Sequence, residues 1–438
     1  MNTRKAYPHI FGYSFLLLLL TSCSVEKQLN RKAKKFLINT PELQSAHVGI
    51  CIFDDSSKTY LYNYQSDKFF IPSSNTKLFT LFAGLTYLPD SLVAARVAYD
   101  NGTVIVQATG DPTFLHPDFT YQPLLKFLQN DDIEVIRINT AFASESFAKG
   151  WSWDDFEAPF MAERDPFPMY GNVATIVYED DSLRTVPPSL LPFVAGQPQY
   201  GKPWQVSREL AGHLYTIDTG KGSTNAEKRI TMAMNKGLFA SRYLADTLHK
   251  TVLTEYSPLS RGNGFAIYSQ PKDSLFKMMM HRSDNFFAEQ TLLMAANEYV
   301  GEMNDAKMID TLLNTVLKNA PQRPKWVDGS GLSRYNLFTP KDMVFILENL
   351  TANFGFSRIQ NILPTANEGT LTGLYKGYEN RIFAKTGSLN NNTALSGYVL
   401  TKQNKRLSFS IMINNYRADA GVVKKEIERF LVGVIERY

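Results

Sequence analysis

The sequence predicts an α+β fold in which both ends of the chain contribute to one antiparallel sheet and a β-rich segment is inserted between them. Three observations carry this prediction. Near the N-terminus, the strand-like stretches 46–53 and 59–64 precede an apolar helix. Near the C-terminus, three strand-like runs precede a helix with one apolar stripe. Between about 91 and 264, short strand-like runs and many prolines interrupt that pattern.

Residues 1–22 predict a lipoprotein signal peptide. Arg4 and Lys5 precede an apolar run, Ile10–Leu20, that is too short to span a membrane. The tetrapeptide Leu20-Thr21-Ser22-Cys23 resembles a bacterial lipobox. That resemblance implies that Cys23 becomes the lipidated N-terminus and anchors the chain to a membrane. The alternative is an ordinary signal peptide with an incidental cysteine.

Residues 23–40 predict a lipidated tether followed by a helix. Val25, Leu29, Ala33 and Leu37 recur at helical spacing, and basic residues fall largely on the opposite side. We expect this helix to pack on the protein with its basic side in solvent. Contact of that side with anionic lipid head groups is a secondary alternative.

The sequence contains one other cysteine, Cys51, in a strand-like stretch. If Cys23 is lipidated, Cys51 has no partner within the chain for a disulfide. We expect a packed, inert thiol rather than a catalytic one.

The rest of the chain divides into three segments. Residues 41–92 and 264–438 are expected to form two parts of one domain, and residues 93–263 a β-rich inserted domain. A hairpin signal at Asp100-Asn101-Gly102 lies near the start of the insert. The predicted elements near the C-terminus are strands at 382–386, 394–400 and 407–413, followed by a helix with Val423, Ile427, Phe430 and Val434 on its apolar side.

Three short motifs occur in order along the chain: Ser74-Asn75-Thr76-Lys77, Ser283-Asp284-Asn285 and Lys385-Thr386-Gly387-Ser388. Patterns of the first two kinds recur elsewhere, so they are weak signals alone, whereas K-T-G occurs once. Context distinguishes the copies of the S-x-x-K pattern, because only Ser74 begins a long buried helix that follows strands. Together the motifs form the signature of penicillin-binding proteins and serine β-lactamases.

The residue types suit nucleophilic catalysis. A serine hydroxyl attacks a carbonyl only when a neighbouring base removes its proton. Lys77 follows Ser74 at a spacing of three, which places both on one side of a helix. A lysine acts as a base only if burial or a second cation lowers its pKa. Lys385 could supply that cation, or bind a substrate carboxylate. Ser73 is expected to cap the helix.

The remaining motif residues have expected roles in holding the substrate and moving protons. Thr386, Gly387 and Ser388 are expected to bind substrate, with Gly387 allowing close approach along the strand. The backbone N–H groups of Ser74 and Ser388 would form an oxyanion hole. Ser283 can relay a proton to the leaving group, and Asn285 can orient Lys77 and a substrate amide.

Further blocks carry a closer resemblance. Asp328-Gly329-Ser330-Gly331-Leu332-Ser333-Arg334-Tyr335-Asn336 is similar to a block of the low-molecular-mass class C penicillin-binding proteins, the D-alanyl-D-alanine carboxypeptidase/endopeptidases of the penicillin-binding protein 4 type. Residues 110–113, 150–155 and 369–371 match that family too. The resemblance implies a penicillin-binding-protein/serine β-lactamase-like transpeptidase fold: an antiparallel sheet with helices on both faces, an all-helical lobe and the insert.

The same resemblance implies an activity. Ser74 would attack the penultimate D-alanine of a peptidoglycan stem peptide, or a D-alanyl–diaminopimelate cross-bridge, and β-lactams would acylate it. An acidic residue of the family's insert meets the diaminopimelate amine, and motif position nominates Asp155. No cofactor is implied. Two features depart from the family: Ser73 stands where alanine is common, and the insert is short for the family's pair of extra domains.

Composition and motifs exclude other functions. The net charge of +4 gives no reason to expect nucleic-acid binding. The six histidines are scattered and no metal-ligand spacing occurs, so no metal is expected.

Two rival functions remain. One is a serine β-lactamase or esterase on the same fold, for which Asp310–Asn314 only superficially resembles the class A glutamate motif. The other is a non-catalytic peptidoglycan-binding lipoprotein. The expected location is the periplasm, lipid-anchored, at the outer membrane, with protein partners unknown.

Overall fold

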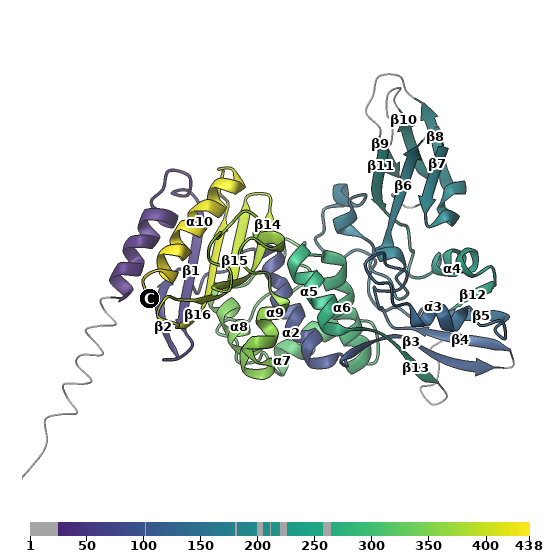
Figure 1. Cartoon of the computed structure of the whole chain (residues 1–438), viewed down its shortest axis with the longest axis horizontal. Coiled ribbons are helices and arrows are strands. Elements are labelled where there is room, and N and C mark those ends of the chain that lie inside the picture. Colours follow the sequence, from purple (N-terminus) through teal and green to yellow (C-terminus); the bar gives the residue numbers. More distant parts are fainter. Residues whose placement is uncertain are drawn as a thin grey trace, which may run out of the picture. The chain divides into compact units, whose positions relative to one another are not determined.

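The structure, a computed structural model, describes residues 25–100, 102–179, 182–198, 205–210, 212–219, 226–256 and 264–438 (Figure 1). The chain forms two compact units. Unit 1 contains the residues up to Asn75, residues 320–324 and the chain from Leu337 onward. Unit 2 contains Thr76–Asn319 and Lys325–Asn336. Unit 2 therefore joins the inserted segment with the helices on either side of it, and the insert's own boundaries stay a prediction. Cys23 and the signal peptide lie outside the described residues.

Unit 1 is built on a five-stranded sheet with the order β14-β15-β16-β1-β2. All of its strand pairs are antiparallel. The strands are β1 (His47–Asp54), β2 (Thr59–Tyr64), β14 (Ile382–Leu389), β15 (Asn392–Leu400) and β16 (Arg406–Asn414). Because β1 pairs with β16, the two ends of the chain meet in one sheet, which confirms the prediction.

Helices cover both faces of this sheet (Figure 1). On one face lie α10 (Ala420–Ile435) and the N-terminal helix, which is α-helical over 25–33 and continues as η1 (Lys34–Ile38). The other face carries α8 (Pro340–Phe354), next to α9 (Phe356–Ile362). Alternation along β15 explains the two layers: Leu395 and Val399 join the core beneath α10, whereas the Tyr398 hydroxyl donates to a backbone carbonyl of α8. The predicted stripes of both terminal helices are buried or packed against that core.

Unit 2 contains a second five-stranded sheet with the order β12-β5-β4-β3-β13, in which β13 follows the predicted end of the insert. Its strands are β3 (Ser91–Asp100), β4 (Thr103–Ala108), β5 (Val135–Asn139), β12 (Thr251–Glu255) and β13 (Phe265–Pro271). Antiparallel pairing of β3 with β13 brings the start of the insert beside the chain that directly follows its predicted end. Asp100 lies opposite Thr103, which confirms the predicted hairpin, and Gly102 takes the left-handed conformation that its turn requires (φ +78°).

Two three-stranded sheets complete the insert, with the orders β11-β6-β7 and β8-β10-β9. The strands are β6 (Val173–Glu179), β7 (Ser182–Val186), β8 (Val194–Pro198), β9 (Gln205–Arg208), β10 (Tyr215–Thr219) and β11 (Ala226–Thr231). The helices and turns of this segment are α3 (Pro123–Leu128), α4 (Ala240–Leu248), η3 (Trp153–Asp155), η4 (Pro159–Met161), η5 (Tyr170–Asn172) and η6 (Pro188–Phe193). The segment is thus β-rich, as its short strand-like runs predict.

The rest of unit 2 is a helical lobe. Its helices are α2 (Lys77–Tyr87), α5 (Lys272–Arg282), α6 (Asn285–Tyr299) and α7 (Asp305–Asn314). Helix α6 packs against the other three. Residues 77–85 of α2 are all buried, which confirms the helix predicted to be apolar nearly all round. Within the described residues, no helix combines the length and apolar character needed to cross a membrane.

Cys51 lies on β1 and is buried and free of any disulfide. Desolvation raises the pKa of its thiol far above the ordinary value. A thiol held in this form is a poor nucleophile. The expectation of an inert, packed cysteine is therefore confirmed.

Candidate active site

Strand β14 and the turn before α2 carry the candidate residues of unit 1. The strand carries Lys385, Thr386, Gly387 and Ser388 and lies at the edge of its sheet. The turn carrying Ser74 packs directly on it, because the Asn75 side-chain amide donates to the carbonyl oxygen of Lys385 at 3.1 Å. Within unit 1, the structure thus brings the first two residues of the first motif, Ser74 and Asn75, next to the third motif.

Gly387 makes this close packing feasible. A Cβ atom at this position would lie 2.8 Å from the carbonyl oxygen of Pro72 and 2.9 Å from the Asn75 Nδ2 atom. Both distances are shorter than van der Waals contact, and one of the two atoms belongs to backbone. The glycine of K-T-G therefore serves the fold in addition to its expected role of admitting a substrate.

The prediction that Ser73 caps α2 is wrong. A 3₁₀ turn, η2 (Ser73–Thr76), precedes the helix, so α2 begins at Lys77 and its N-cap position falls on Thr76. Thr76 makes no side-chain capping hydrogen bond. Ser73 is buried and has a left-handed backbone (φ +51°), an unfavourable conformation for a residue with a side chain. Ser74, in contrast, is only half-buried.

Lys77 is fully buried at the start of α2 in unit 2. Its amine donates to Asn285 Oδ1 at 2.7 Å and to the carbonyl oxygen of Ser330 at 2.7 Å. Desolvation lowers the pKa of Lys77 to about 8, against the opposing effects of Asp328, Glu289 and Asp284. Near neutral pH, a larger fraction of this lysine is therefore neutral than of an exposed lysine.

The second motif lies at a sharp break between two helices. Ser283 ends α5 with a left-handed backbone (φ +58°), and the Asp284 carboxylate caps α6 by accepting from the Phe287 N–H at 2.9 Å. Asn285 is the first residue of α6. Besides contacting Lys77, its side-chain amide donates to the carbonyl oxygen of Phe160 at 2.9 Å.

The backbone of residues 328–336 folds around the carboxylate of Asp328. Asp328 accepts hydrogen bonds from the Gly331 and Ser333 backbone N–H groups at 2.8 and 2.7 Å. It also accepts from the Trp151 indole at 2.9 Å. Asp155, in η3, is partly exposed on the loop that runs from Trp151 to Phe160. One end of this loop is held by the bond from Trp151 to Asp328, and the other by the bond from Asn285 to Phe160.

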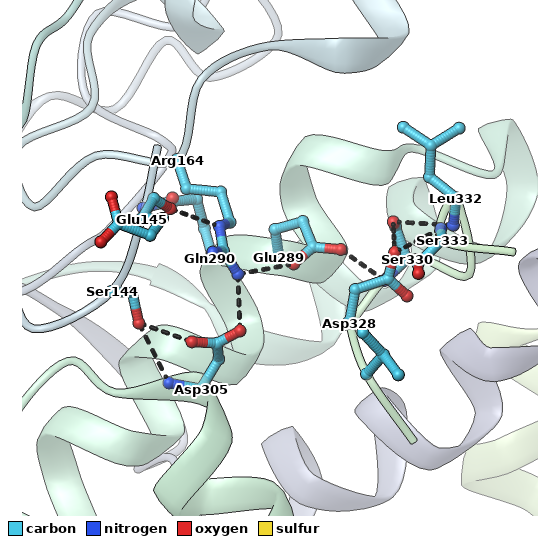
Figure 2. A network of polar contacts seen from close by, with 12 residues as sticks. Ser144, Glu145, Arg164, Glu289, Gln290, Asp305, Asp328, Ser330, Leu332 and Ser333 are labelled. Atoms are coloured by element: carbon cyan, nitrogen blue, oxygen red, sulfur yellow. Dashed lines mark hydrogen bonds and ion pairs between the residues drawn. The ribbon is translucent and has the colours of Figure 1, made fainter. Parts of the chain in front are cut away.

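Figure 2 shows a buried polar network around Glu289 that reaches Ser330, the residue whose carbonyl accepts the Lys77 amine. Ser330 belongs to a block that the sequence singles out, whereas Glu289, Arg164, Asp305 and Ser144 do not. Glu289 of α6 accepts the Ser330 N–H at 2.7 Å, and its other oxygen lies 3.4 Å from Arg164 Nη1. Arg164 also pairs with Asp305 at 2.7 Å. Ser144 donates to Asp305 at 2.6 Å. One signal for this network is present in the sequence: Glu289 is a carboxylate within a mainly apolar stretch of helix, four residues after Asn285.

Asp310–Asn314, the stretch that resembles the class A motif, forms the last turn of α7. Leu312 and Leu313 are buried in it, whereas Asp310 is exposed. The stretch therefore has the packing role that its apolar spacing indicates.

Comparisons with known proteins match almost the whole chain. A model of the family described as D-Ala-D-Ala carboxypeptidase 3 (S13) matches residues 29–186 and 206–437. The D-alanyl-D-alanine carboxypeptidase DacB of Haemophilus influenzae is 24% identical over 449 residues, which cover 91% of each chain. Penicillin-sensitive carboxypeptidase A of Dictyostelium discoideum is 38% identical over 102 residues, which cover 20% of this chain and 19% of that one.

Solved structures show the same fold. Penicillin-binding protein 4 of Haemophilus influenzae superposes with a TM-score of 0.75 at 22% identity, covering 94% of this chain and 99% of its own. A predatory peptidoglycan endopeptidase of Bdellovibrio bacteriovorus superposes with a TM-score of 0.53 at 14% identity, covering 89% and 93%. The expected fold class is confirmed.

Proposed function

The chain belongs to the D-Ala-D-Ala carboxypeptidase 3 (S13) family, and on that premise we propose that it cleaves D-alanyl bonds of peptidoglycan stem peptides through an acyl-enzyme on Ser74. The reaction is acyl transfer followed by hydrolysis: Ser74 Oγ attacks the carbonyl, the D-alanyl amine leaves, and water releases the acyl group. The observation that carries this proposal is the environment of Lys77. Its buried amine is held by Asn285 and the Ser330 carbonyl, three residues after the proposed nucleophile.

In this proposal Lys77 is the general base. Burial gives it a pKa of about 8, so a useful fraction of the amine is neutral near physiological pH. Asn285 orients the amine, and Ser283 relays a proton to the leaving amine. Both residues are held by the break between α5 and α6, which fixes their backbone without relying on a mobile loop.

Strand β14 is the proposed docking edge for the stem peptide. An edge strand offers backbone donors and acceptors to an extended peptide, and Thr386, Gly387 and Ser388 lie on it. Lys385 is proposed to supply positive charge for the C-terminal carboxylate of the peptide. The backbone N–H groups of Ser74 and Ser388 form the proposed oxyanion hole. Asp155 is proposed to meet the diaminopimelate amine.

We further propose that the enzyme is a periplasmic lipoprotein held at the outer membrane through Cys23. The support is the lipobox at residues 20–23, with no acidic residue immediately after it to act as an inner-membrane retention signal. The described chain begins two residues later with a helix packed on unit 1. Replacing Cys23 with serine should prevent acylation and release the protein into the soluble periplasmic fraction. Acylated protein from the Cys23→Ser variant would contradict the anchor.

Covalent labelling by a fluorescent penicillin tests the nucleophile. We expect the wild type to be labelled, Ser74→Ala to lose the label, and Ser73→Ala to keep it provided that the variant folds. A labelled Ser74→Ala variant would overturn the assignment. Rapid turnover of the drug without a stable adduct would indicate a β-lactamase, and an unlabelled wild type would indicate a binding lipoprotein.

Mass spectrometry of muropeptides after digestion by the purified enzyme identifies the bond that is cut. Loss of a terminal D-alanine from monomers indicates carboxypeptidase activity. Conversion of cross-linked dimers to monomers indicates endopeptidase activity. Unchanged muropeptides together with penicillin labelling would contradict the proposed substrate.

A further inference from the structure

Glu289 lies in an unusual place for a carboxylate. It is only 1% exposed and lies one helical turn after Asn285 on α6, so both side chains project from the same side of the helix. A charged group so deeply buried is costly unless its partners are well placed. Its partners therefore indicate what it does.

Those partners connect Glu289 to Lys77 through one residue. Glu289 accepts the backbone N–H of Ser330, and the backbone carbonyl of Ser330 accepts the Lys77 amine, each at 2.7 Å. The Lys77 amine in turn donates to Asn285, one turn before Glu289 on α6. These contacts form a closed loop: α6 binds the lysine directly through Asn285, and indirectly through Glu289 and Ser330.

The inserted segment contributes the counter-charge. Arg164 is 2% exposed, lies beside both Glu289 and Asp305, and donates from its Nε atom to the carbonyl oxygen of Glu145 at 2.9 Å (Figure 2). Stability alone is a weak reason to keep such a buried ionic group, because well-packed apolar side chains often stabilise a core as well or better.

We propose that Glu289 is a positioning residue for acylation: it holds the Ser330 carbonyl against the Lys77 amine, and its negative charge sets the pH range in which Lys77 can accept a proton. Arg164 of the inserted segment keeps Glu289 in place. The inference deepens the proposed function and rests on Lys77 being the general base.

The direction of the charge effect follows from the groups around each residue. Asp328, Glu289 and Asp284 all favour the protonated form of Lys77. Glu289 itself faces Asp328, Arg164 and Asp305; burial and Asp328 raise its pKa to about 7, and Arg164 opposes that rise. Because the pKa of Glu289 lies below that of Lys77, Glu289 carries its negative charge through the upper part of the pH range in which Lys77 titrates. Removing this charge lowers the pKa of Lys77, so neutral lysine is available at lower pH.

The test is the pH dependence of the penicillin acylation rate in Glu289→Gln. Glutamine keeps an oxygen that can accept the Ser330 N–H but carries no charge. We expect the acidic limb of the profile to move to lower pH by about one unit. Glu289→Ala also removes the acceptor, and we expect its plateau rate to fall on the order of 10- to 100-fold through misplacement of Lys77.

Glu298→Gln is the matched control. Glu298 lies on the same helix, nine residues further on, and also pairs with an arginine of the inserted segment, Arg96, at 2.7 Å. At 1.5 Å per residue it is about 13 Å from Glu289 along the helix axis. We expect its pH profile to match that of the wild type, so a shift in Glu298→Gln equal to that of Glu289→Gln would overturn the proposal.

The outcomes separate this inference from the proposed function. If the wild type is not labelled, or Ser74→Ala is, the proposed function fails. If the wild type is labelled on Ser74 but Glu289→Gln has an unmoved acidic limb, the positioning role fails. If Glu289→Gln does not fold, Glu289→Asp replaces it: this variant keeps the charge with a shorter reach, so the limb should stay in place while the plateau rate falls. A wild-type plateau in Glu289→Asp would then overturn the proposal.

Discussion

The Asn75 side-chain amide donates to the backbone carbonyl of Lys385 at 3.1 Å, which ties the turn that carries Ser74 to the strand that carries K-T-G. The two residues are 310 positions apart in the chain. The contact depends on Gly387, where even one added carbon would meet the turn. The geometry around the proposed nucleophile is therefore a property of the packing of β14 against that turn.

Gly387→Ala should slow acylation by on the order of 100-fold, because the new Cβ atom pushes the turn away and displaces Ser74. Overpacking of this kind also destabilises a fold by about 1–3 kcal/mol. Penicillin labelling rates and denaturant unfolding measure the two effects. Gly196→Ala is the control, since Gly196 lies in strand β8 with nothing within 4 Å of an added Cβ atom. Equal acylation rates in both variants would contradict the steric role of Gly387.

Lys77→Ala should reduce the acylation rate on the order of 10²–10⁴-fold, since the serine loses its base. In the wild type, the rate should rise with pH as Lys77 loses its proton around a pKa of about 8. This dependence should disappear in the variant. Lys272→Ala is the control: its amine is also buried and donates to the carbonyl oxygens of Leu85 and Leu88. Near-normal acylation by Lys77→Ala would refute the role of general base.

Arg164→Met should destabilise the protein by about 3–5 kcal/mol, because Glu289 and Asp305 lose their shared buried cation. Arg184→Met is the comparison, because Arg184 pairs with Glu179 on the surface, where an ion pair contributes about 0–1 kcal/mol. Urea unfolding of the three proteins measures the difference. Similar losses of unfolding free energy in both variants would show that the network around Arg164 stabilises the fold no more than a surface ion pair does.

Asp55 and Glu348 should make the free energy of unfolding depend on pH. The Ser408 hydroxyl lies 2.8 Å from an Asp55 oxygen and 2.7 Å from a Glu348 oxygen, and desolvation raises the pKa of Asp55 to about 7. A raised pKa means that the folded state holds a proton that the unfolded state releases. The contribution is fully present below the ordinary pKa of an aspartate and is lost as the pH rises through about 7.

Asp55→Asn should remove that dependence, since asparagine does not titrate. Relative to the wild type, the variant should become steadily more stable between about pH 4 and pH 7. Desolvation raises the pKa of Glu348, but hydrogen bonds from Asp55, Ser408 and Lys58 lower it overall, so its own contribution to stability has the opposite sign. The bonds from Ser408 and Lys58 remain in the variant. Denaturant unfolding at a series of pH values tests this, and a constant difference between the two proteins would contradict it.

Much of the fold could be predicted because its signals are local. Apolar spacing identifies the terminal helices and α2, and alternating or continuous apolar runs identify β1, β2 and β14–β16. The K-T-G motif occurs once in the chain, so its assignment needs only sequence order and context. The prediction that α2 opens at Ser74 with Ser73 as its cap is wrong, because a 3₁₀ turn and an α-helix share the same short-range residue preferences.

The sequence by itself determined the residue types available for acyl transfer, their order, and the meeting of the two chain ends in one sheet. Only the tertiary structure decided what surrounds Lys77: the Ser330 carbonyl, Glu289 behind it, and Arg164 from the insert. The reason is physical. Periodicity records which side of an element is buried, whereas the pKa of a buried lysine depends on desolvation and on charges that arrive from segments distant in the chain.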